Sequence, residues 1–388
     1  MLCSFITTLH LGEILPTEDF GFFNLLKRII PMGAVIILLG FDKSYIKYFS
    51  ERTQLKIYKF VFPMILMNSF LITIIFDNIY EFDEFAISIY FCLVAFSSII
   101  FLSSYARFKN QYGMAQFVQA GYKVIFFIIV IYFFQNNGMY SISIVNVYQL
   151  SFIIPLIYIL KYIFDENSLE KSVSFKNFKE ILSYGFLFFL VNIFNLIIVN
   201  VEGLFIPYYY GQEANGVYSG ISFIYITVFV MVGTSVGYVI FPTLSKKESF
   251  NIKRLSIFAF IVLVLFSFLF IIFGDLINDL AFKGRFDKYR TFELDMMFIS
   301  IGGLQFINNL LHWFILGLAN KNNITKYLYT IIYVFFGYII LIVSVAHFGT
   351  KNFATIVPAV LISWFFKIII TLVFIKKINL INSLNYNN

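Results

Sequence analysis

Four basic residues lie inside long apolar stretches of this chain, where charged side chains are rare. They are Lys27, Arg28, Lys123 and Lys367. Arginine binds a phosphate through two parallel hydrogen bonds, whereas lysine acts as a compact point charge. We therefore predict a cationic pocket for a phosphate-bearing ligand. For Lys27, Arg28 and Lys367 the alternative is that the long side chain extends along apolar surface to reach water.

A polar stripe runs along the apolar stretch at 294–317. Gln305, Asn308, Asn309 and His312 follow the spacing i, i+3, i+4 and i+7, which is one face of a helix. Amides and imidazole both donate and accept hydrogen bonds, as sugar hydroxyls require. Sugar binding and hydrogen bonding between neighbouring helices explain the stripe equally well. The single histidine does not indicate a metal site.

Acidic side chains are rarer still in the apolar stretches. Glu202 is the one acid deep in the stretch 180–206, and Asn192 and Asn195 share its helical face. A carboxylate there is a candidate site for a proton or Na⁺. The alternative, which we favour, is a structural hydrogen bond near the end of the helix. Asp42, at the end of its own stretch, is expected to pair with a nearby lysine.

Eleven apolar stretches of membrane-spanning length must position these side chains. A bilayer core of about 30 Å requires about 20 apolar residues in a helix. The chain is 60% hydrophobic and only 13% charged, against roughly 25% charged residues in soluble domains. It is therefore predicted to be an all-α polytopic membrane protein. The stretches lie near 21–42, 56–76, 85–105, 112–134, 144–163, 180–206, 217–242, 255–273, 294–317, 327–346 and 354–375.

Basic and acidic loops alternate between the predicted spans. Most of the 28 lysines and arginines fall on one side, and most loop acids fall on the other. The positive-inside rule makes the basic side cytoplasmic, so the C-terminus is inside and the turn at 13–20 is outside. The net charge of +7 fits these loops and contact with anionic lipid head groups. Spread over many short loops, it does not indicate nucleic acid.

The chain is predicted to contain two lobes, 1–163 and 180–388, joined by a cytoplasmic linker at 164–179. Both halves repeat the order and direction of the spans, so the repeat is parallel. Transporters with parallel repeats place the substrate between the halves and alternate access by rocking them. The counterpart of span 180–206 would begin before residue 1, and residues 1–12 are too short to span alone. The first helix is therefore expected to be truncated.

Several short stretches resemble motifs of a known family. Residues 11–23 read L-G-E-I-L-P-T-E-D-F-G-F-F, and residues 40–43 read G-F-D-K, followed by Lys47, Tyr48, Ser50 and Glu51. Residues 210–218 read Y-G-Q-E-A-N-G-V-Y, and residues 241–245 read F-P-T-L-S. They resemble helix ends and external turns of the O-antigen and capsule repeat-unit flippases of the Wzx type. These flippases are relatives of the multidrug and toxic-compound extrusion (MATE) transporters.

The resemblance implies a MATE-like fold, with two six-helix lobes around a central cavity. It also implies that an undecaprenyl-pyrophosphate-linked oligosaccharide is moved from the cytoplasmic to the outer leaflet of a bacterial inner membrane. Arg28, Lys123, Lys27 and Lys367 would then hold the pyrophosphate, and the polar stripe the sugar. The implied partners are the lipid-linked oligosaccharide, membrane lipids and other polysaccharide-assembly proteins. No cofactor is implied; H⁺ or Na⁺ is the candidate coupling ion.

Other functional classes stay open at this point. A membrane enzyme such as an O-antigen polymerase carries a large external loop with catalytic arginines, whereas the loop at 274–293 holds Arg285 and Arg290 but is short. A MATE-like extruder of a drug or another lipid is the second alternative, and the basic intramembrane residues argue against a cationic drug. A non-transporting remnant is the third. The sequence has no recognisable phosphate-cradling loop, metal-ligand cluster or nucleophile with its base, so we expect a transporter rather than an enzyme.

Overall fold

The computed structural model describes residues 2–42, 58–108, 111–134, 141–165, 175–245, 252–318, 321–349 and 352–378. Within these ranges the chain is almost entirely helical and has no strand, which confirms the all-α prediction. The chain divides into two compact units, Met1–Ile197 and Ile198–Asn388.

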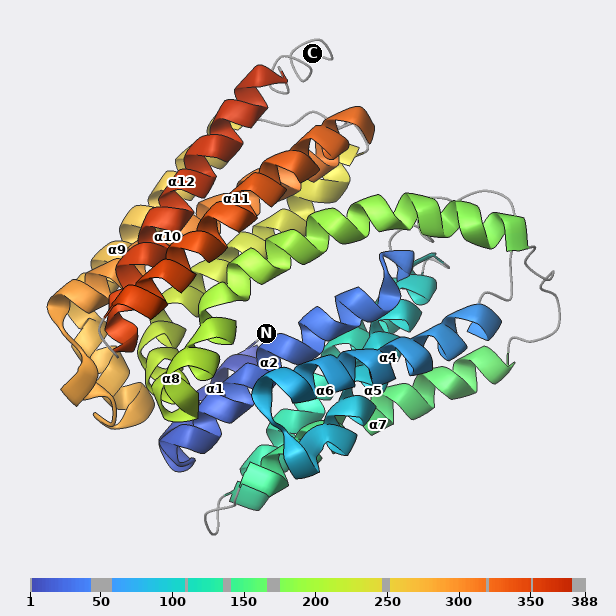
Figure 1. The fold of residues 1–388 in the computed structure, drawn as a ribbon, viewed down its shortest axis with the longest axis horizontal. Coiled ribbons are helices and arrows are strands. Elements are labelled where there is room, and N and C mark those ends of the chain that lie inside the picture. The colour runs from blue at the N-terminus through green and yellow to red at the C-terminus, as the bar shows by residue number, and fades with distance from the viewer. Residues whose placement is uncertain are drawn as a thin grey trace. The chain divides into compact units, whose positions relative to one another are not determined.

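The first unit is a helical bundle in which α5 is central. α5 (Ala86–Phe108) packs against α2 (Thr17–Leu38), α4 (Tyr58–Tyr80), α6 (Tyr112–Phe134) and α7 (Ser141–Asp165). A short helix, α1 (Leu2–Ile14), lies against α6 and α2, and a 3₁₀ turn at Asp83–Phe85 leads into α5. These helices run from blue to green in Figure 1. Four helices, α1, α2, α6 and α7, position the site described below.

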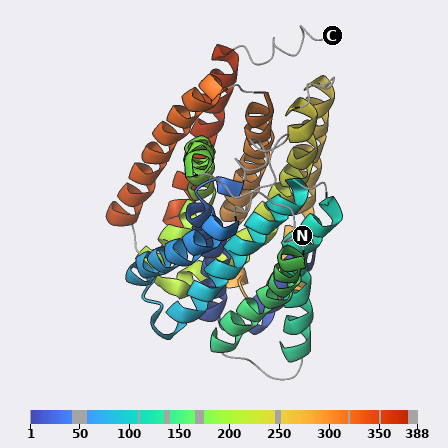
Figure 2. The ribbon, with the colours of Figure 1, turned by 90° about the vertical axis from the view of Figure 1, so that its right-hand side faces the viewer.

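The second unit contains α9 (Ile252–Phe282), α10 (Phe292–Leu318), α11 (Lys321–Phe348) and α12 (Ile356–Lys377). Short 3₁₀ turns at Asp287–Tyr289 and Phe353–Thr355 precede α10 and α12. α12 packs against both α10 and α11, and α11 and α12 run side by side (Figure 1; Figure 2). α8 (Phe175–Ser245) consists of two helices that meet at a kink, and it contributes residues to both units.

Each of the eleven predicted apolar stretches coincides with a helix over most of its described residues. Nine helical segments of the described residues are long and apolar enough to cross a membrane. One of these, Gly185–Gly237, covers most of two predicted spans, and a shorter apolar helix at Ile144–Ile157 corresponds to the predicted span 144–163. The prediction of a polytopic membrane protein is confirmed, with ends that differ by a few residues.

The predicted external turn at 210–218 contains a kink between two helices, and the residues on either side of the kink are helical. Backbone geometry inside α8 departs from the helix at Gly211, where φ is 86° and ψ is 171°. This region of backbone conformation is open to glycine because glycine lacks a Cβ atom. The two helices within α8 therefore meet at Gly211.

Gly40, in the second motif, lies where α2 ends beside α8. Leu39 and Gly40 both have positive φ, 48° and 73°. A Cβ atom on residue 40 would collide with the carbonyl oxygen of Gly185, so only glycine permits this approach. The beginning of α8 thus packs on the first unit.

Residues 180–197 belong to the first compact unit of the structure. The sequence analysis assigns them to the second lobe. The predicted lobe boundary stays a prediction, because residues 166–174 of the linker 164–179 lie outside the described residues. Motif residues 43–51 and many of the basic loop residues also lie outside them.

Candidate functional site

A small cavity of about 170 Å³ lies inside the first unit. Four helices enclose it, and Lys27 of α2 and Lys123 of α6 both line it. Two of the four basic residues predicted from the sequence therefore share one cavity. The other lining residues are Ser4, Thr8, Phe23, Pro31, Tyr122, Phe126 and Tyr148.

Helical spacing explains how the lining residues reach the cavity. Phe23, Lys27 and Pro31 follow one another at four-residue intervals on α2, so they share one face. Ser4 and Thr8 have the same spacing on α1. The Lys27 ammonium donates a 2.6 Å hydrogen bond to Oγ1 of Thr8. The short helix α1 thus supplies a hydroxyl that holds one of the two lysines.

Aromatic rings form the rest of the wall. Nζ of Lys27 lies 5.4 Å from the ring centroid of Phe23, and Nζ of Lys123 lies 5.7 Å from that of Tyr122. Both distances fall within cation–π range, where the ring face attracts a positive charge. Phe126 stacks on Phe23 at 5.7 Å, centroid to centroid. The cavity can therefore hold two ammonium groups in an apolar setting.

The described lining of the cavity is basic. It contains two lysines and no aspartate or glutamate. Like charges repel more strongly at low dielectric than in water, so an anion that enters would relieve the repulsion. A phosphate or pyrophosphate group meets this requirement and also has acceptor oxygens for the lysines and for Ser4.

Arg28 does not line this cavity, although it follows Lys27 directly. Successive residues of a helix point in different directions, so neighbours in sequence do not share a face. Arg28 is half-buried. Its predicted role as a phosphate ligand beside Lys123 stays a prediction.

Lys367 lies in the second unit, on the buried face of α12. Lys367 is 2% exposed, and its Nζ lies 4.5 Å from the ring centroid of Trp364. The side chain is therefore held inside the unit rather than extended to the membrane surface.

Glu202 is also buried and makes a hydrogen bond within the second unit. The hydroxyl of Tyr338 donates to Oε2 of Glu202 over 3.3 Å. A hydrogen bond of this kind is compatible with the structural role that the sequence analysis favours for Glu202, and that role stays a prediction. Asn192 and Asn195, half-buried on the same helix, belong to the first unit by compactness. Asp42 is half-buried just after α2, and the nearest lysines in sequence, Lys43 and Lys47, lie outside the described residues.

The polar stripe on α10 faces several neighbours rather than one. Nδ1 of His312 lies 3.2 Å from the hydroxyl of Tyr327 on α11. Asn309 lies against Gly233 on α8, where a Cβ atom would come within 3.2 Å of the asparagine Cβ. Gln305 and Asn308 are buried, and Nε2 of Gln305 and both amide atoms of Asn308 have no hydrogen-bond partner among the described residues. The two amide nitrogens can donate to a sugar hydroxyl or a water, and Oδ1 of Asn308 can accept from one.

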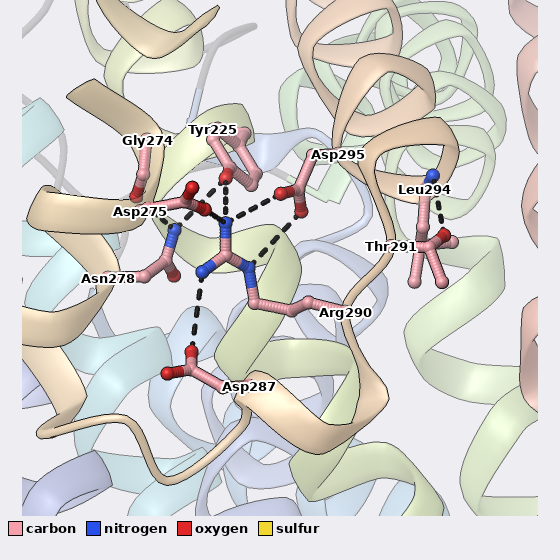
Figure 3. Close-up of polar contacts among 9 residues, drawn as sticks. All are labelled: Tyr225, Gly274, Asp275, Asn278, Asp287, Arg290, Thr291, Leu294 and Asp295. Atoms are coloured by element: carbon pink, nitrogen blue, oxygen red, sulfur yellow. Dashed lines mark hydrogen bonds and ion pairs between the residues drawn. The ribbon is translucent and has the colours of Figure 1, made fainter. Parts of the chain in front are cut away.

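A cluster around Arg290 is the main feature that the sequence analysis missed. The guanidinium contacts carboxylate oxygens of Asp295, Asp275 and Asp287 at 2.6, 2.9 and 3.3 Å (Figure 3). It also donates to the hydroxyl of Tyr225 at 3.0 Å. Burial alone would lower the pKa of Arg290, but the hydrogen bond that Arg290 donates to Asp295, the charges of Tyr225 and Asp295, and the hydrogen bond to Asp275 together outweigh burial and raise it.

This cluster joins the end of α9, the following turn and the start of α10 to α8. The side chain of Arg290 is 7% exposed, and three carboxylates already occupy its donors. The arrangement therefore stabilises the unit and does not present a cation to an anionic ligand. Aspartates at 275, 287 and 295 around one arginine were the signal in the sequence.

Comparisons with known proteins support the fold. A family model described as polysaccharide biosynthesis protein matches residues 1–248. An uncharacterized membrane protein of Methanocaldococcus jannaschii is 24% identical over an alignment that covers 94% of this chain and 79% of that protein. A solved structure, the inward-facing conformation of a multidrug resistance MATE family transporter of the MOP superfamily, has a TM-score of 0.67 and 12% identity. That alignment covers 99% of this chain and 95% of the solved chain.

These findings confirm the predicted family of polysaccharide-assembly proteins and the predicted fold class. Family and fold together identify a multi-pass membrane protein of the polysaccharide biosynthesis family.

Proposed function

Because the chain belongs to the polysaccharide biosynthesis protein family, we propose that it flips an undecaprenyl-pyrophosphate-linked oligosaccharide repeat unit across a bacterial inner membrane. The observation that carries this proposal is the cavity that Lys27 and Lys123 share in the first unit. Its positive excess suits the pyrophosphate that joins sugar to lipid. The C-terminus would be cytoplasmic, as the distribution of basic loops predicts.

The size of the cavity limits which part of the substrate it can hold. Pockets for drug-sized ligands enclose about 300–1,000 Å³, whereas this cavity has about 170 Å³. It can receive a pyrophosphate group, but an oligosaccharide is too large. Oligosaccharide and polyprenyl chain must therefore lie outside it, and the buried amides of Gln305 and Asn308 are the candidate sugar ligands.

Transport would proceed by alternating access, as in other transporters built from two repeated halves. The lysines would bind the pyrophosphate on one side of the membrane and release it on the other. Glu202 is the candidate residue for coupling this cycle to H⁺ or Na⁺. Its hydrogen bond from Tyr338 would have to break or change when the carboxyl group gains or loses the ion.

Complementation tests this function. In a strain that lacks the gene, surface glycan should be lost and lipid-linked repeat units should accumulate, and expression of the chain should reverse both changes. Normal levels of lipid-linked intermediates in the deletion strain would contradict the proposal. That result would favour a MATE-like extruder of another lipid or drug, which the likeness to a multidrug transporter keeps as the second candidate.

A further inference from the structure

A separate pocket of about 670 Å³ lies between α11 and α12, at the end of α12. Two lysines line it, Lys326 near the start of α11 and Lys377 in the last turn of α12. Both are exposed. The pocket lies wholly within the second unit and shares no residue with the cavity of Lys27 and Lys123.

Each helix contributes one continuous face to the pocket. On α11, Lys326, Tyr329 and Thr330 lie at i, i+3 and i+4. On α12, the residues at 370, 373, 374 and 377 repeat this spacing, and the first three are apolar. The pocket is therefore a groove with a basic end and an apolar floor.

The basic end lies where membrane head groups are found. Lys326 is in the first turns of the candidate span Asn322–Phe348, and Lys377 is the last residue of the candidate span Phe353–Lys377. No aspartate or glutamate is among the described lining residues. A basic pocket between membrane helices is a suitable site for an anionic lipid head group.

The floor of the groove is fixed by packing. The ring of Phe374 lies 5.4 Å from that of Tyr327, centroid to centroid, and the Tyr327 hydroxyl is 3.2 Å from Nδ1 of His312. α10, α11 and α12 therefore hold one another at this level. His312, predicted as a sugar ligand, here supports the groove from behind.

The apolar floor indicates a lipid rather than a soluble anion. Ile370 and Val373 are 38% and 59% exposed, and they continue from the lysine end into the span. In a bilayer this surface faces hydrocarbon. A free phosphate would use the lysines alone, whereas a phospholipid would also cover the floor with an acyl chain.

We propose that this groove binds an anionic membrane phospholipid, with its phosphate between Lys326 and Lys377 and an acyl chain along Ile370, Val373 and Phe374. The site is independent of the transported substrate. The lipid would stabilise the contact between α11 and α12.

Native mass spectrometry of the purified full chain, titrated with phosphatidylglycerol or phosphatidylcholine, tests the proposal. Each lysine near the membrane surface is expected to contribute about fivefold to affinity for an anionic lipid, or roughly thirtyfold for the pair. The double variant Lys326→Gln/Lys377→Gln should weaken phosphatidylglycerol binding by that factor. Lys326→Arg/Lys377→Arg should bind like the wild type, and so should the matched control Lys376→Gln, because Lys376 is exposed beside the groove but does not line it.

Three results would overturn the proposal. Equal binding by wild type and the double glutamine variant would show that the lysines are not ligands. An equal loss in Lys376→Gln would show that charge alone, not the groove, attracts the lipid. Displacement of the lipid by inorganic phosphate would identify a site for soluble anions. The single variants Lys326→Gln and Lys377→Gln, each expected to lose about fivefold, keep the test decisive if the double variant folds poorly.

Discussion

The two units surround their inward-facing cations in different ways. In the second unit, Arg290 is bonded to three aspartates and a tyrosine hydroxyl. In the first unit, Lys27 and Lys123 share a cavity lined by aromatic rings and hydroxyls, with no carboxylate among the described lining residues. A cation bonded to several carboxylates contributes to stability, whereas two lysines that line one cavity can attract an anion. We therefore expect the Lys27 and Lys123 cavity of the first unit to bind an anion, and the Arg290 cluster to stabilise the second unit.

Substitution of Lys123 should have the largest effect on transport. Lys123→Ala should abolish glycan export while the protein remains in the membrane, because half of the cavity's positive charge is lost. Lys123→Arg should retain part of the activity. Surface glycan and protein abundance in the complemented deletion strain measure both quantities. Unchanged export with Lys123→Ala would show that this lysine is no substrate ligand.

The Arg290 cluster should affect stability instead. Asp295→Asn should lower the free energy of unfolding by about 3 kcal/mol, because it removes one partner from a largely buried ion pair. Asp275→Asn should cost less than about 1 kcal/mol, because that carboxylate is 97% exposed. Thermal unfolding in detergent compares the two variants. Equal effects would mean that burial does not govern this cluster.

Glu202 separates a coupling role from a structural one. Glu202→Gln keeps an oxygen that can accept from Tyr338 but cannot exchange a proton. If the residue is structural, transport and stability should both stay near the wild type. If it couples transport to an ion, the protein should remain stable but lose the dependence of transport on a proton or Na⁺ gradient in liposomes. Loss of both stability and transport in Tyr338→Phe, which removes the hydroxyl that donates to Glu202, would favour the structural role.

Removal of the hydroxyl that holds Lys27 should have the smallest effect. Thr8→Val deletes the 2.6 Å hydrogen bond to the ammonium and keeps the shape of the side chain. We expect a loss of substrate affinity worth about 1 kcal/mol. Serine at this position should restore the affinity. A complete loss of transport would mean that α1 does more than orient the lysine.

The spans could be predicted from the sequence because hydropathy reports on each helix separately. The sequence could not predict that Lys27 and Lys123 line the same cavity, because this depends on how α1, α2, α6 and α7 pack together. The sequence analysis favoured Arg28 over Lys27 as a phosphate ligand, but of these two consecutive residues on α2 only Lys27 lines the cavity.

The stripe on α10 shows the same limit. Its spacing correctly places four polar residues on one side of the helix, yet that side is wide enough for Asn309 to face α8 and His312 to face α11. The sequence predicted a turn near Gly211, but it did not indicate which residue has the non-helical backbone. Local patterns thus predict the elements, and the partners of each side chain follow from packing.

Binding of undecaprenyl pyrophosphate to the purified chain tests the central claim most directly. The double variant Lys27→Gln/Lys123→Gln should be compared with the wild type and with Lys253→Gln, an exposed lysine of α9 outside the cavity. Since a hydrogen bond to a charged group contributes about 1.5–3 kcal/mol, the double variant should bind more than about tenfold more weakly, and the control should bind normally. Equal affinity in all three proteins would contradict a pyrophosphate site between Lys27 and Lys123.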